Sequence, residues 1–126
     1  MLKGILHVNL TISPGAAALA EAHHFYVQVL GLEVLERPDS VDSGSPGWWL
    51  GCQNGQQIHI SAEQNPDKYN APSSRHAAFQ VESLEVLQQR LQENGVTIIS
   101  DSQFAGQRRF FVRDPWGNRL EFVEIL

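Results

Sequence analysis

An internal repeat most constrains how this chain can fold. Two segments align without a gap, residue 48 onto residue 110 and residue 60 onto residue 122, and they match Trp49 with Phe111, Gly55 with Gly117 and His59 with Glu121. Upstream of these segments, Gly31 and Gly95 are the expected stops of two helices, and two expected opening strands contain His7 and His76. Matched landmarks in the same order predict two copies of one supersecondary unit.

The first copy reads as a strand, a helix and three strands. Residues 5–12 alternate polar and apolar side chains, as in a half-buried strand whose apolar face carries Leu6, Val8, Leu10 and Ile12. Ser13 and Pro14 are typical of a helix start, and Gly31 of a helix end. The expected elements are a helix over 16–30, a strand over 32–35, a loop over 37–47 and a hairpin of 48–52 with 56–61 around Asn54-Gly55.

The second copy follows a polar stretch, residues 64–74, that we predict to be a linker. Ser83 is a candidate cap for a helix that ends before Gly95. The other expected elements are strands over 76–81 and 96–99 and a closing hairpin of 109–112 with 119–125. We therefore expect an α+β fold with module one at about residues 1–65 and module two at about residues 74–126, within a single domain spanning residues 1–126.

Composition narrows the possible partners. Nine Lys and Arg stand against fourteen Asp and Glu, a formal net charge of −5, and no cationic run is present to neutralise phosphates. Nucleic acid is therefore not expected as a partner. Cys52 is the single cysteine, which excludes an internal disulfide framework and suits a reducing compartment. No long apolar run or signal peptide occurs, so we expect a cytoplasmic protein with no membrane partner.

Four polar residues share the strand face opposite the apolar alternation. They are His7, His59, His76 and Glu121. Neutral imidazoles and a carboxylate form a ligand set for Fe, Mn, Co, Ni or Zn, with positions left open for substrate. Polar residues on a solvated sheet face would show the same alternation, so the residues alone leave both interpretations open.

The sequence resembles the vicinal oxygen chelate superfamily, which includes glyoxalase I, extradiol dioxygenases, fosfomycin resistance enzymes and bleomycin resistance proteins. The similarity is most specific in two stretches, His24-Phe25-Tyr26 with Leu30-Gly31-Leu32, and residues 111–118 leading to Glu121. It implies two tandem βαβββ modules whose sheets form a cup around one divalent metal ion. The ligand positions of the family map onto His7, His59, His76 and Glu121.

Departures from the individual subfamilies leave the reaction open. Glyoxalase I carries a carboxylate where this chain has His59, and the fosfomycin enzymes carry a Thr and a Tyr where this chain has Asn9 and Phe111. Extradiol dioxygenases use two His and one Glu around Fe(II), which His7, His76 and Glu121 could supply. In that case His59 would be free for acid–base work. Bleomycin-type binders generally lack this ligand set.

Further residues are candidates for substrate contact. A two-residue turn at Asn54-Gly55 would place residue 50 opposite His59, so that Trp48 and Leu50 share the inward face of His59. Asn9 lies on the same strand face as His7. Arg109 could clamp a substrate carboxylate, although a salt bridge or a solvated position is the commoner role of such an arginine.

These observations predict a metal-dependent enzyme of the glyoxalase or dioxygenase type. Its small substrate would chelate the metal through vicinal oxygens, with Glu121 or His59 as the catalytic proton carrier. Dioxygenase and lyase or isomerase chemistry both remain open. The alternative is a small-molecule binding protein of the bleomycin resistance type that sequesters its ligand. Because family members of this length often pair two chains, we expect a homodimer.

Overall fold

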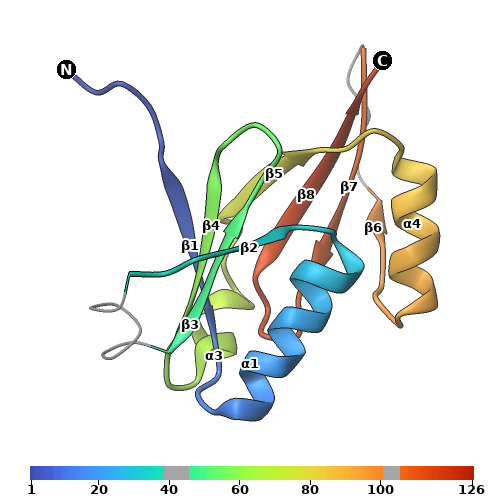
Figure 1. The fold of residues 1–126 in the computed structure, drawn as a ribbon. Helices are drawn as coiled ribbons and strands as arrows, with labels where there is room; N and C mark the ends of the chain where they lie inside the picture. Colours follow the sequence, from blue (N-terminus) through green and yellow to red (C-terminus); the bar gives the residue numbers. More distant parts are fainter. Residues whose placement is uncertain (39–45, 101–105) are drawn as a thin grey trace. The chain divides into compact units, whose positions relative to one another are not determined.

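The computed structural model describes residues 1–38, 46–100 and 106–126, and these form two compact units, Met1–Pro66 and Asp67–Leu126. Each unit contains one four-stranded mixed sheet and helical segments (Figure 1). The predicted α+β class with two βαβββ modules is therefore confirmed. Most of the predicted loop over 37–47 lies outside the described residues.

The first unit is built on the sheet order β1-β4-β3-β2. β1 and β4 are parallel, whereas the β4–β3 and β3–β2 pairs are antiparallel. The elements are β1 (His7–Ile12), α1 (Ala16–Ala22), the π-helix η1 (His23–Val29), β2 (Glu33–Leu35), β3 (Gly47–Gly51) and β4 (Gln57–Ala62).

The second unit repeats this arrangement with the sheet order β5-β8-β7-β6, and its β5–β8 pair is again parallel. Its elements are β5 (His76–Gln80), α4 (Leu84–Glu93), β6 (Ile99–Ser100), β7 (Gln107–Arg113) and β8 (Arg119–Ile125). The chain passes from one unit to the other through α3 (Pro66–Asn70). This short helix corrects the prediction of a linker throughout 64–74.

One face of each sheet is apolar and buried. In the first unit the buried strand residues are Leu10, Ile12, Leu50, Ile58 and Ile60. The Trp48 indole N–H, on the same face, donates a 2.9 Å hydrogen bond to the carbonyl of Leu19 in α1. In the second unit Phe110, Val112, Leu120 and Phe122 are buried in the same way. Because side chains alternate along a strand, the odd-numbered residues of β3, β4, β7 and β8 lie on the opposite face.

The helices differ from the predictions mainly at the start of the first one. α1 begins at Ala16 with Gly15 as its N-cap and no side-chain cap, so the predicted cap at Ser13 is wrong. In α4 the Ser83 hydroxyl accepts from the Val86 N–H at 3.3 Å, which confirms the predicted cap. None of the helices in the described part of the chain is long and apolar enough to span a bilayer.

The two hairpins share one turn geometry. In the first, the Cys52 N–H donates to the Gln56 carbonyl at 2.8 Å and Gly55 lies at φ 88°. In the second, the Asp114 N–H donates to the Asn118 carbonyl at 2.9 Å and Gly117 lies at φ 82°. Each loop therefore has three residues that end in a left-handed glycine, a common hairpin geometry.

This turn corrects the predicted strand register by one residue. A two-residue turn would pair residue 50 with His59, whereas the third loop residue moves the pairing so that Trp49 lies opposite His59 and Leu50 lies opposite Ile58. In the second hairpin Phe111 lies opposite Glu121 by the same rule. Trp49, rather than Trp48 or Leu50, consequently shares the face of His59.

Residues outside the closing turn contact it and hold it in place. One guanidinium nitrogen of Arg113, Nη1, donates to the carbonyls of Asn70, Ser73 and Gly117 at 3.1, 2.9 and 3.0 Å. A Cβ added at Gly117 would lie 3.0 Å from the backbone nitrogen of Ala71, whereas one added at Gly55 would meet nothing within 4 Å. The two equivalent turns therefore differ in the space around their glycines.

We predict that Gly55→Ala lowers the free energy of unfolding by about 1–2 kcal/mol, the cost of a left-handed alanine. Gly117→Ala should cost roughly 1 kcal/mol more, because backbone atoms at Ala71 must move as well. Guanidinium unfolding of the two variants measures this difference. Equal losses would show that the contact with Ala71 is not a constraint on the closing turn.

Candidate functional site

The face of the first sheet opposite its apolar core carries a row of aromatic rings. β1 contributes His7, β4 contributes His59 and β3 contributes Trp49. The ring centroids of His7 and His59 are 3.8 Å apart with planes 11° from parallel, and those of His59 and Trp49 are 4.3 Å apart with planes 8° from parallel. His59 is therefore held between two flat neighbours.

Polar contacts hold this face in place. The Nε2 atom of His59 donates to the Gln57 amide oxygen at 2.8 Å, which leaves Nδ1 as its basic nitrogen. The Asn9 side-chain amide donates to the Ser61 hydroxyl at 2.9 Å, so Asn9 lies on the face as predicted but already has a partner. Burial, and then the charges of His7 and Arg37, lower the pKa of His59.

Two residues predicted to contact substrate lie on the other face of this sheet. Leu50 has no exposed surface, and the Trp48 indole is directed to the carbonyl of Leu19 in α1. Both predictions rested on the two-residue turn and are corrected with it. Trp49 was missed for the same reason, because a glycine at position 55 fits a two-residue turn as well as a three-residue one.

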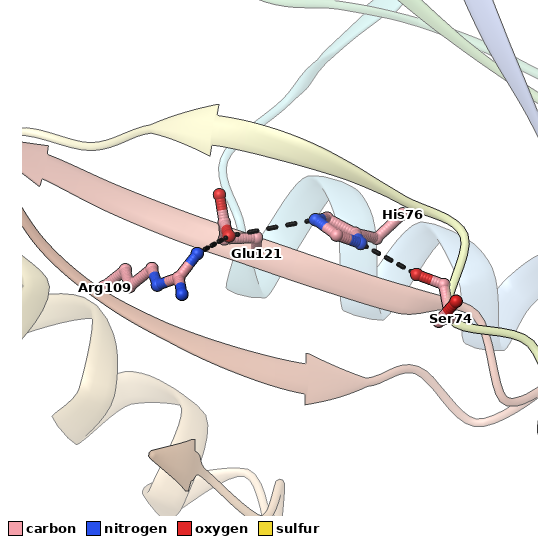
Figure 2. A network of polar contacts seen from close by, with 4 residues as sticks. All are labelled: Ser74, His76, Arg109 and Glu121. Atoms are coloured by element: carbon pink, nitrogen blue, oxygen red, sulfur yellow. Dashed lines mark hydrogen bonds and ion pairs between the residues drawn. The ribbon is translucent and has the colours of Figure 1, made fainter. Parts of the chain in front are cut away.

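The equivalent face of the second sheet carries a polar network (Figure 2). His76, from β5, donates from Nδ1 to the Ser74 carbonyl at 2.9 Å, and its Nε2 atom lies 3.8 Å from a carboxylate oxygen of Glu121 in β8. Arg109, from β7, donates to that same oxygen at 2.9 Å. Glu121 is buried, with 8% of its surface exposed, so the ion pair compensates a charge that has lost most of its water.

Phe111 is the centre of the same face. It lies opposite Glu121 in the register, and the His76 ring meets its edge at 5.2 Å. The guanidinium carbons of Arg109 and Arg119 lie 5.4 and 4.0 Å from its ring centroid. Sequence reasoning did not single out Arg119, because its position beside Phe111 depends on the strand register.

The structure thus brings the four predicted ligands together as two pairs, His7 with His59 in the first unit and His76 with Glu121 in the second. Within neither unit do three or more described His, Cys, Asp or Glu side chains cluster as a metal centre would require. The donor types nevertheless fit a divalent metal ion. In particular, a histidine that donates one ring N–H to a backbone carbonyl, as His76 does, is oriented as metal-ligating histidines usually are.

Comparison with known proteins finds one family that matches nearly the whole chain. Residues 4–122 match the model of the Glyoxalase/Bleomycin resistance protein/Dioxygenase superfamily. A relative from Arabidopsis thaliana, "Glyoxylase I 4", is 29% identical over 95% of this chain and 70% of its own length.

Solved structures agree with the family match. The crystal structure of a glyoxalase family protein from Bacillus anthracis has a TM-score of 0.85 and 34% identity, and covers 100% of this chain and 98% of its own. TnmS3, an antibiotic binding protein from Streptomyces sp. CB03234, shares the fold at 15% identity, with a TM-score of 0.73 and 99% and 98% of the two chains covered. The chain therefore belongs to the glyoxalase, bleomycin resistance protein and dioxygenase superfamily, the vicinal oxygen chelate superfamily that its motifs resemble.

Proposed function

We propose that this protein is a metal-dependent enzyme that acts on a small molecule with vicinal oxygen atoms. One divalent ion, Fe, Mn, Co, Ni or Zn, would be held by His7, His59, His76 and Glu121. The observation that carries the proposal is the arrangement of His76, Glu121 and Arg109 on the open face of the second sheet.

His76 supports the proposal through its ring orientation. Its Nδ1–H is engaged with the Ser74 carbonyl, so the lone pair is on Nε2, the atom that faces Glu121. Metal ligands of this type generally have their second nitrogen held by a carbonyl or carboxylate, which fixes the tautomer and the ring plane.

The first sheet supports the proposal through the lowered pKa of His59. A metal ion binds the neutral imidazole, and the lowered pKa of His59 favours that form near neutral pH. Gln57 accepts the hydrogen bond from Nε2 of His59, so Nδ1 is the ring nitrogen whose lone pair remains available to a metal ion. His7 is the second proposed ligand from this unit, and its ring must turn out of the 3.8 Å stack to share an ion, because imidazole lone pairs lie in the ring plane.

The repeat explains why each module would supply two ligands. His7 and His76 come from the parallel opening strands, and His59 and Glu121 occupy equivalent positions in the closing strands. We propose that the two faces meet around one ion, either within one domain spanning residues 1–126 or across a homodimer. We also propose a cytoplasmic location, which the single cysteine suits.

The residues have distinct chemical roles in this proposal. Bound metal would act as a Lewis acid that holds two substrate oxygens and stabilises negative charge on them. Arg109 holds the Glu121 carboxylate in place through its 2.9 Å hydrogen bond, and thereby contributes to substrate binding indirectly. Glu121 or His59 would accept and return the proton. Both dioxygenase and lyase or isomerase chemistry are compatible with this set of groups.

A second function has its own support in the row of rings on the first sheet. His7, His59 and Trp49 present a flat aromatic surface with Asn9 beside it, which suits stacking of a planar ligand. TnmS3, which shares the fold, is described as an antibiotic binding protein. Stoichiometric ligand uptake by metal-free protein, unchanged by Glu121→Ala, would favour a binding protein without catalysis.

We predict that tag-free protein binds about one divalent ion per chain, as expected for a single site with an open substrate position. Glu121→Gln should lower that stoichiometry severalfold, whereas Glu124→Gln, which removes a carboxylate paired with Arg108, should not. Plasma mass spectrometry measures both. Absence of metal in the wild type after reloading with each ion, with no stabilisation near the 2.7 kcal/mol expected at about a hundredfold excess over Kd, would refute the metal site.

We also predict that His59 of the metal-free protein titrates below the usual histidine pKa of 6.5. His7→Asn should raise this pKa towards 6.5 without reaching it, because burial, the larger cause, remains. As the pH falls through 6.5 the unfolded chain takes up the proton first, so His59 lowers the free energy of unfolding until the pH passes its folded pKa.

Nitrogen-15 NMR of the imidazole resonances follows this titration directly. His24→Asn, which removes a histidine bound to Gln28 on the helix, is the matched control and should leave the pKa of His59 unchanged. A pKa of His59 at or above 6.5 in the wild type would contradict the assigned ring environment.

A further inference from the structure

The face of β7 and β8 opposite the apolar core carries an excess of positive charge. Arg109, Arg113 and Arg119 lie on this face with Glu121 as the one carboxylate among the odd-numbered residues of the two strands, so three cations against one anion leave +2. The chain as a whole has a net charge of −5. A cationic sheet face attracts anions locally, even on a protein whose net charge is negative.

Two of the three arginines are already occupied. Arg109 is paired with Glu121, and Arg113 donates to the carbonyls of Asn70, Ser73 and Gly117. Arg119 has a different environment. Within residues 1–38, 46–100 and 106–126 its guanidinium group makes no hydrogen bond or ion pair, and it lies over Phe111 with the guanidinium carbon 4.0 Å from the ring centroid.

The position of Arg119 connects it to the candidate metal ligands of this unit. In the sheet register it lies beside His76 on β5, and it precedes Glu121 by two residues on the same face of β8. Successive residues on one face of a strand are roughly 7 Å apart. A ligand of ordinary metabolite size that contacts Glu121 or His76 would therefore reach Arg119.

We propose that Arg119 binds a carboxylate group of the substrate. This inference rests on the proposed function, because it takes the face with His76 and Glu121 as the substrate site, and it adds the substrate class: a small anionic molecule whose carboxylate lies next to its metal-chelating oxygens. Arg119 then determines specificity, while Arg109 positions Glu121.

The chemistry of the guanidinium group supports this assignment. Its planar fork donates two parallel hydrogen bonds to a carboxylate, and charge-assisted pairs of this kind are the strong ones. Stacking on Phe111 holds the fork in one plane without using any of its N–H donors. Little side-chain entropy is then left to lose when an anion binds, which favours affinity.

The test compares benzoate with benzamide, its neutral analogue of nearly the same shape, on metal-free protein. Titrations are followed by the Nε–H resonance of Arg119 in nitrogen-15 NMR spectra. We expect benzoate to shift this resonance saturably and to bind about tenfold or more tightly than benzamide, the difference that a hydrogen-bonded charge provides. Added salt should weaken benzoate binding.

Three variants separate the role of Arg119 from a general effect of charge. Arg119→Gln should reduce benzoate affinity by about tenfold and leave benzamide affinity unchanged. Arg119→Lys keeps the charge but not the fork and should retain part of the preference. Arg90→Gln removes an exposed arginine of α4 and should change neither ligand. A wild type with equal affinity for the two ligands, or an Arg119→Gln variant with unreduced benzoate affinity, would overturn the proposal.

Metal uptake by the same proteins, measured separately after reloading with each divalent ion, distinguishes this inference from the proposed function. A protein that selects benzoate through Arg119 but takes up no metal would support the carboxylate site and refute the metalloenzyme. A protein that binds metal at Glu121 but does not distinguish benzoate from benzamide would do the reverse.

Discussion

A left-handed glycine at the end of a three-residue turn determines which way the candidate site faces. Gly55 and Gly117 set the register of the two hairpins, so that His59 and Glu121 lie on the face opposite the apolar core. A shift of one residue would exchange the two faces of a strand and place these polar groups in the apolar core. Asp114 reinforces the second turn, because its carboxylate accepts hydrogen bonds from the backbone N–H groups of Trp116 and Asn118 at 2.9 and 2.8 Å.

The two repeated faces have diverged in a complementary way. The first presents flat rings, with His59 between His7 and Trp49. In the second, Phe111 takes the position of Trp49 and Glu121 that of His59, and arginines surround the ring. The first face is thus suited to stacking and the second to charge recognition. Duplication followed by such divergence gives one chain two chemically different sheet faces.

Much of this arrangement could be predicted from the sequence because the strongest signals are local. Polar alternation identified β1, the glycines at 31 and 95 marked both helix ends, and the repeat placed His59 and Glu121 at equivalent positions. The predicted strand register, and with it the face assigned to Trp48 and Leu50, failed because the turn is one residue longer than expected. Asn54-Gly55 is equally compatible with turns of two and three residues, and only the folded strands show which one closes. Arg119 escaped notice because one arginine in a sequence gives no sign of the ring on which it stacks.

We propose that two ligands from each module hold one metal ion, and X-ray absorption spectroscopy at the edge of the bound metal tests this ligand set. We expect scattering from three imidazoles and one carboxylate, with one imidazole lost in His7→Ala and another in His76→Ala. Because those two substitutions lie in different modules, the loss of one imidazole in each would show that the modules share one ion. A spectrum that either substitution leaves unchanged would contradict a site shared by the two modules.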